Sequence, residues 1–115
     1  MDFIAAKNTA AREVALAFGV PPMLLGIPGD NTFANFAEAN RNFWRQTIVP
    51  LVLRLCDSMS LWLEPHAGGT LQLKPDLDQV EALSFDRDAL WARVNAATFL
   101  TTDEKREAVG YTAQN

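Results

Sequence analysis

Residues 35–63 read NFAEANRNFWRQTIVPLVLRLCDSMSLWL, and this stretch decides the fold class of the chain. Mostly apolar residues recur in it at the three- and four-residue spacing of one face of an α-helix. The stripe consists of Phe36, Asn40, Phe43, Thr47, Leu51, Leu55, Met59 and Trp62, with Ile48 and Val52 beside it. At about 1.5 Å per residue, the stretch predicts a single amphipathic helix roughly 40 Å long.

Two features are expected to shape this helix. Asn35 is followed three residues later by Glu38, which resembles a capping box at the helix N-terminus. Pro50 lies inside the run, where it lacks a backbone N–H and its ring clashes with the preceding turn. We therefore expect a kink near residues 46–50, and an end to the helical pattern at the Glu64-Pro65 pair.

The residues before the long helix predict a second helix and a loop. Residues 3–18 are rich in Ala, carry apolar residues at helical spacing and contain no Gly or Pro. Gly19 is expected to stop this helix, because two prolines follow it closely. One apolar turn is expected over residues 22–25, and residues 26–34 are rich in turn-forming residues and predict a loop.

The residues after the long helix predict one strand and several short helices. Thr-Leu-Gln-Leu-Lys at residues 70–74 alternates as a strand does, and a strand over 71–74 needs a pairing partner. Short helices are expected over residues 78–83 and 85–97. A last helix is expected to begin at a capping box and to end at a glycine, with the final five residues frayed; these boundaries are Thr101, Glu104 and Gly110.

The predicted fold class is therefore mainly α, with a long kinked helix, shorter helices and one or two short β-strands. We expect two parts, a helical part over residues 1–64 and a part over residues 65–115 with the strand and the C-terminal helices.

Composition narrows the classes of function. The formal net charge of −4 argues against tight wrapping of nucleic acid, which needs clustered Lys and Arg. A single cysteine, Cys56, excludes a disulfide within the chain and suits a reducing cytoplasm. The apolar run over residues 48–63 is interrupted by Pro50, Arg54 and Asp57, so no membrane span is expected.

No residue pattern indicates catalysis, a cofactor or a metal site. A triad could be assembled from Asp57, Ser58 or Ser60, and His66, but no glycine-flanked nucleophile turn accompanies them. One His and one Cys do not supply the four ligands of a zinc site. We therefore predict no enzyme, no cofactor and no metal.

Basic and aromatic residues share the long helix, and two interpretations of them are open. The residues are Arg41, Trp44, Arg45, Arg54 and Trp62. Such neighbours can stack and neutralise a nucleic acid. We favour an oligomer interface, because Arg and Trp are enriched in protein–protein contacts.

The sequence resembles the portal (head–tail connector) proteins of tailed bacteriophages, in the lambdoid-like branch shared with gene transfer agents. Its residues match the family's motifs in the family's order along nearly the whole chain. The matching residues are Ala11-Arg12-Glu13-Val14-Ala15-x-Ala17-Phe18-Gly19-Val20-Pro21-Pro22, Leu24-Leu25-Gly26, Thr32-Phe33-Ala34-Asn35, Glu38-Ala39-Asn40-Arg41, Phe43, Thr47-Ile48, Pro50-Leu51 and Leu100-Thr101-x-Asp103-Glu104-x-Arg106 with Gly110. The family more often has Tyr-Ser at Phe33-Ala34 and Asn at Asp103.

The resemblance implies a structural subunit of a ring, commonly of twelve copies, at one vertex of the capsid. DNA is packaged and ejected through such a ring, so the implied partners are other copies of the chain, terminase, head–tail adaptor proteins and transient double-stranded DNA. The implied location is the virion, with assembly in the bacterial cytoplasm. A portal subunit is usually far longer, and the chain resembles only its C-terminal part, after the stem and clip.

The resemblance also assigns roles to residues. It implies a channel loop that faces the DNA, formed by Gly29, Asp30, Asn31, Thr32, Phe33 and Asn35. The alternative is a flexible turn that only caps the next helix. Pro50 would bend the long helix between the channel and the wing of the ring. At the level of the whole chain, the alternative is a small helical interaction module derived from a truncated prophage portal gene.

Overall fold

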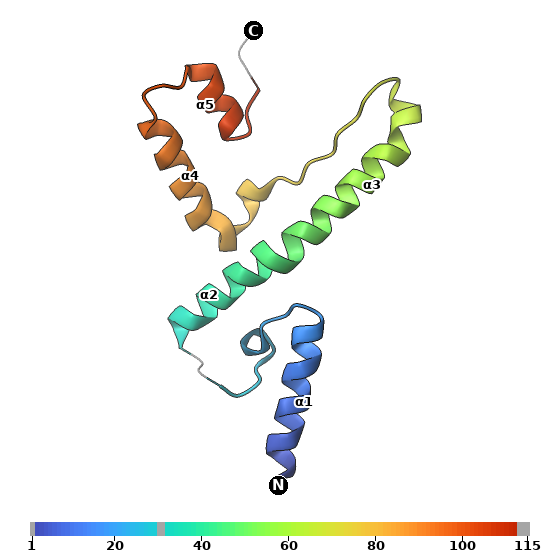
Figure 1. Ribbon diagram of the computed structural model, residues 1–115, viewed down its shortest axis with the longest axis vertical. Helices are drawn as coiled ribbons and strands as arrows, with labels where there is room; N and C mark the ends of the chain where they lie inside the picture. The colour runs from blue at the N-terminus through green and yellow to red at the C-terminus, as the bar shows by residue number, and fades with distance from the viewer. Residues whose placement is uncertain (1, 30–31, 113–115) are drawn as a thin grey trace. The chain divides into compact units, whose positions relative to one another are not determined.

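The computed structural model describes residues 2–29 and 32–112, and these are mainly α-helical (Figure 1). The predicted fold class is confirmed, including the long helix. The chain divides into two compact units, residues 1–77 and residues 78–115. The functional division at residues 64 and 65 stays a prediction.

The first unit begins with helix α1, Phe3–Ala17. The Asp2 carboxylate caps it by accepting a hydrogen bond from the Ile4 N–H at 3.1 Å. At the other end, Gly19 adopts a φ of 68°, and the N–H of Val20 donates to the carbonyl of Ala15 at 2.9 Å. This glycine-terminated end matches the prediction. A 3₁₀ turn over Pro22–Leu25 follows, as predicted, and Gly26 closes it with a φ of 74°.

The long helix comprises α2 (Phe33–Phe43), a π-turn (Trp44–Ile48) and α3 (Val49–Ala67), which form one continuous ribbon in Figure 1. Both predicted ends were wrong by about one turn. Thr32 is the N-cap in place of Asn35, because the Thr32 hydroxyl accepts the Asn35 N–H at 3.1 Å. Pro65 is accommodated inside the last turns of α3, so the helix ends at Gly68, whose φ is 71°.

The π-turn changes which face of the long helix the chain covers. Its wider ring is seen in the hydrogen bond from the Val49 N–H to the Trp44 carbonyl, five residues back. One extra residue in a turn shifts every later position of a helical stripe by one. The covered positions accordingly continue from Phe43 and Thr47 not to the predicted Leu51, Leu55, Met59 and Trp62. They continue to Val52, Cys56 and Leu63, which are half-buried, and to Ser60, which is buried.

The predicted strand is absent from the part of the chain that the structure describes. Residues 71–76 are extended, and their side chains alternate between half-buried and exposed, as the sequence pattern indicated. One of them, Leu73, bonds a helix side chain in place of a second strand. The Leu73 N–H donates to the Ser60 hydroxyl at 2.8 Å, and that hydroxyl donates to the Cys56 carbonyl at 2.7 Å. A single extended segment makes no ladder without a second strand.

The second unit consists of two short 3₁₀ turns and two helices. The turns are Leu77–Gln79, at the boundary, and Glu81–Leu83, where one short helix was predicted. Helix α4 is Ser84–Ala96, and α5 is Thr102–Ala108. The predicted capping box of α5 is confirmed, with the Thr101 N–H donating to the Glu104 carboxylate at 2.7 Å.

Both units have small cores. The buried apolar residues of the described chain are Ala15, Leu83, Val94 and Val109, and no large side chain among the described residues is fully buried. Eighteen large apolar residues remain exposed in the same part of the chain. The described helices include none long and apolar enough to cross a membrane.

Candidate functional site

The segment predicted as a channel loop joins the 3₁₀ turn to α2. Asp30 and Asn31 lie outside the described residues. On one side of them, the Arg12 guanidinium donates to the Pro28 carbonyl and ties the loop to α1. On the other side, Thr32 caps α2, and the Phe33 side chain is 90% exposed. The described residues on each side are thus anchored, and those on the α2 side include an exposed aromatic ring.

A close backbone contact joins this end of the chain to the π-turn. The Thr47 hydroxyl donates to the Gly19 carbonyl at 2.5 Å. A Cβ atom at Gly19 would lie 2.7 Å from the Thr47 oxygen, so no other residue fits there without movement. The contact therefore fixes the end of α1 against the middle of the long helix, and it explains a glycine and a threonine that the sequence places 28 residues apart.

The predicted oligomer-interface residues lie along the long helix. Arg41 forms an ion pair with Glu38 within α2. Trp44 and Arg45 belong to the π-turn, with Trp44 half-buried and Arg45 exposed. Arg54 is exposed, and Trp62 is 70% exposed. Their role in an interface stays a prediction.

An apolar stripe on α3 extends the surface around Trp62. The π-turn leaves it uncovered by the chain. Its members are Leu51, Leu55, Met59 and Trp62, which are 45, 54, 47 and 70% exposed. We call these four residues the α3 stripe. A contiguous uncovered apolar surface of this kind is typical of a protein–protein contact.

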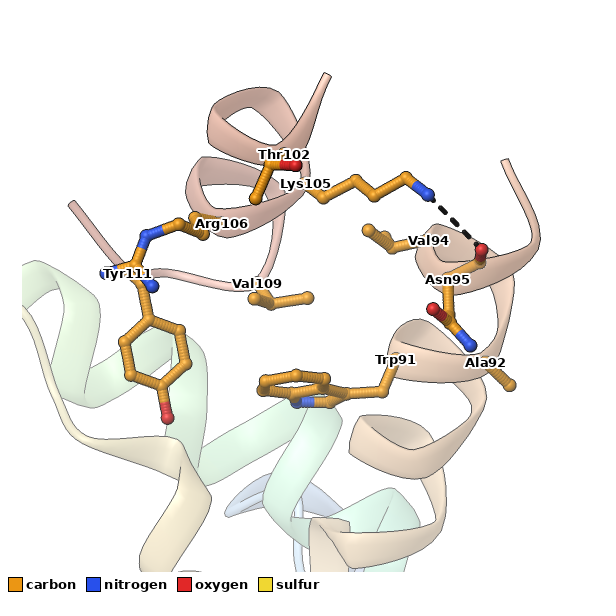
Figure 2. Close-up of a pocket in the computed structure, with 9 residues that line it drawn as sticks. All are labelled: Trp91, Ala92, Val94, Asn95, Thr102, Lys105, Arg106, Val109 and Tyr111. Atoms are coloured by element: carbon orange, nitrogen blue, oxygen red, sulfur yellow. Dashed lines mark hydrogen bonds between the residues drawn. The ribbon is translucent and has the colours of Figure 1, made fainter. Parts of the chain in front are cut away.

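The second unit contains a groove that the sequence analysis did not predict (Figure 2). Its cavity of about 470 Å³ lies between α4 and α5. Trp91 and Tyr111 form an edge-to-face pair with ring centroids 5.9 Å apart, and Val94 and Val109 lie between the two helices. Gly110, with a φ of 94°, reverses the chain after α5 and brings Tyr111 to Trp91.

Tyr111 and Thr112 are therefore held in place, so the prediction of a frayed end is wrong for these two residues, and its other three residues, 113–115, lie outside the described residues. The Tyr111 N–H donates to the Arg106 carbonyl at 2.8 Å, and the Arg106 Nε donates to the Thr112 carbonyl at 3.0 Å. The glycine at position 110 was the sequence signal for this turn. The pairing with Trp91, twenty residues earlier, had no signal in the sequence.

The residues of the possible triad are either engaged in structural hydrogen bonds or exposed on α3. The Ser60 hydroxyl bridges Leu73 and Cys56, so its proton and its lone pair are both engaged. Asp57, Ser58 and His66 are exposed on α3. Within residues 2–29 and 32–112, no group of three His, Cys, Asp or Glu side chains is placed to hold a metal ion.

Comparison with known families assigns the chain to a class of protein. The family Phage portal protein matches residues 1–110. The chain therefore belongs to the phage portal protein family, as the sequence resemblance implied.

Relatives with similar sequences come from two Rickettsia species. An uncharacterized protein of Rickettsia felis is 48% identical over 110 residues, and one of Rickettsia bellii is 47% identical over the same length. Each match covers 96% of this chain and 29% of the relative. The chain thus spans less than a third of the length of these relatives.

Solved structures of gene transfer agent (GTA) particles are similar as well. A chain in the neck of a native GTA particle, computed with C12 symmetry, is 55% identical with a TM-score of 0.78. A chain in the virion of a native GTA particle is 55% identical with a TM-score of 0.77. Both matches cover 99% of this chain and 32% of the solved chain.

Proposed function

We propose that this chain is a structural segment of a portal ring subunit, and that the ring forms the channel for genome packaging and ejection. Membership of the portal family supports the class of assembly. The similar chain in a GTA neck computed with C12 symmetry supports a ring of about twelve copies. The proposed location is the portal vertex of a virion assembled in the bacterial cytoplasm.

The uncovered α3 stripe is the observation that carries the proposal. Full burial of a Leu or Met side chain contributes about 1.5–3 kcal/mol, and the chain leaves the residues of the stripe 45–70% exposed. A ring subunit would bury this surface against its neighbours. The exposed cation and indole at Arg54 and Trp62, on the same helix, suit the edge of such a contact.

We further propose that the segment from Gly29 to Asn35 is the channel loop. It supplies small, polar and acidic residues next to the exposed Phe33 ring. An acidic, weakly binding lining lets a duplex slide, because few Lys or Arg residues are present to replace its counterions. Terminase and head–tail adaptors are proposed as partners of the complete subunit, and we propose no catalysis or cofactor.

The experiment is the native mass of the chain by light scattering across a concentration series. We expect a large species of nearly fixed stoichiometry. Leu55→Asp places a charge on the α3 stripe, so it should weaken this species at least tenfold in apparent dissociation constant. The control is Asp57→Lys, which reverses an exposed charge about 200° further around the same helix and should leave the mass unchanged.

The result decides between the two candidate functions. A chain that stays a monomer or a two-fold dimer at every concentration would contradict the ring and favour the small interaction module. Far-UV circular dichroism of each variant checks that helix content is retained.

A further inference from the structure

We propose that the α4/α5 groove of one copy binds the N-terminal end of α4 of a second copy, with Phe85 inserted and Glu81 and Asp88 facing the cations of the groove. This inference rests on the proposed ring, and it names a contact within it. The two surfaces belong to the same compact unit, residues 78–115.

The groove has the properties of an unfilled apolar socket. Its volume of about 470 Å³ lies within the range of about 300–1,000 Å³ that is usual for binding pockets. Trp91 remains 45% exposed and Tyr111 50% exposed, although each packs against the other. An aromatic side chain is the matching occupant, because ring edges and faces attract one another beyond the area that they bury.

The groove also carries two cations that form no ion pair within the described chain. The Lys105 ammonium donates to the backbone carbonyl of Asn95 at 3.3 Å, as Figure 2 shows. The Arg106 guanidinium donates to a backbone carbonyl and lies 5.7 Å from the centre of the Tyr111 ring. Neither cation forms an ion pair with a carboxylate in the described chain. An occupant with acidic groups beside its aromatic ring would therefore complement both parts of the groove.

The N-terminal end of α4 presents these features together. Phe85 is 68% exposed. Asp88 lies one helical turn further, on the same side of α4, and Glu81 lies in the 3₁₀ turn just before the helix. Glu81 and Asp88 are exposed, and neither makes an ion pair or side-chain hydrogen bond with the described residues. The chain thus carries both surfaces of the proposed contact: an aromatic ring flanked by acidic residues, and an apolar groove that carries two cations.

The spacing of the two surfaces requires a second copy. Phe85 is the second residue of α4, whereas Val94 lines the groove nine residues later, about 13 Å along the helix axis. Each copy therefore offers one groove and one Phe85 end, and when successive copies are joined head to tail through them the contact is heterologous, the kind that closes into a ring. Arg87 bonds the Val109 carbonyl at 3.1 Å and pairs with Asp78, which holds the two surfaces in one unit.

Charge reversal tests the contact in the full chain. Two variants should each raise the apparent dissociation constant of self-association at least tenfold. One is Phe85→Ala, and the other, the groove variant, combines Lys105→Glu with Arg106→Glu. Adding Glu81→Lys and Asp88→Lys to the groove variant restores complementary charges and should recover most of the loss. The matched control is Arg93→Glu, which reverses an exposed cation of α4 outside the groove and should have little effect.

The readouts separate this contact from the ring itself. If Phe85→Ala and the groove variant self-associate as tightly as wild type, the proposed contact is wrong and the ring proposal is unaffected. Loss in the groove variant without recovery in the fourfold variant would also overturn it, because a distorted α5 then explains the loss. A wild-type chain that never self-associates would reject the ring, and this contact with it.

Discussion

At the scale of single residues, the contact between Gly19 and Thr47 fixes how the first helix meets the long one. Gly19 needs a positive φ to end α1, and it needs the absence of a Cβ atom to let the Thr47 hydroxyl reach its carbonyl. These two requirements are separable, because Gly26 has a similar φ of 74° and no atom within 4 Å of the point where a Cβ atom would lie.

Gly19→Ala is expected to cost more stability than Gly26→Ala. The backbone strain of a left-handed alanine costs about 1–2 kcal/mol at either position. At Gly19 the contact with Thr47 should add about 1 kcal/mol or more, since overpacking typically costs about 1–3 kcal/mol. Urea unfolding followed by circular dichroism measures both. The extra cost should disappear when Thr47→Ala is combined with Gly19→Ala, and its persistence there would show that the clash is not its cause.

At the scale of elements, the π-turn decides which side of α3 the chain uses for itself. Pro50 cannot donate to the carbonyl four residues before it, and its ring crowds that turn. The wider π-turn, which ends two residues before Pro50, relieves this crowding, and π-turns of this kind often mark functional positions. Its consequence is a one-residue shift, which exposes the α3 stripe and places Ser60 under the extended segment.

Pro50→Ala is expected to straighten the long helix. Restoring the N–H lets a regular α-helical turn replace the irregular one, so its two ends should move apart. Spin labels at Phe36→Cys and His66→Cys, in a Cys56→Ser background, report the distance by pulsed electron paramagnetic resonance. Pro65→Ala is the control, because Pro65 lies in the last turns of the same helix and should not bend its middle. An unchanged distance in Pro50→Ala would contradict the predicted kink.

At the scale of the whole molecule, the chain carries more apolar surface than its two units cover. Only four apolar residues are buried in the described chain, while residues such as Trp62 and Phe85 remain mostly exposed. A small domain that buries so little is marginal by itself. The proposed ring supplies the missing contacts, with the α3 stripe and the groove of the second unit as separate surfaces.

A charge change in the proposed channel loop should act on all copies of the ring at once. We expect Asp30→Lys to raise the affinity of the assembled chain for a short DNA duplex by at least tenfold, and to steepen its dependence on salt. Fluorescence anisotropy of a labelled duplex at about 50 and about 200 mM salt measures both. Glu107→Lys on α5 makes the same change of charge elsewhere. Equal effects of the two variants would contradict a DNA-facing loop.

Local signals within a few residues were enough to predict much of this chain. The glycine after α1, the Thr101–Glu104 capping box and the periodicity of residues 35–63 each involve neighbours along the sequence. They determine the end of α1, the start of α5 and the existence of the long helix, because hydrogen bonds within one or two turns satisfy the exposed backbone groups. The order of the family motifs identified the class of protein in the same way.

Only the tertiary structure decided which surfaces are covered and which are free. The π-turn moved the covered side of α3 by one residue, and Ser60 took the place of a partner strand for Leu73. Trp91 and Tyr111 met to form the groove. The last two contacts join residues that are distant in sequence, and the π-turn depends on how the helix relieves the crowding at Pro50. Helical periodicity along the sequence records neither, so it could not predict which side of α3 is covered.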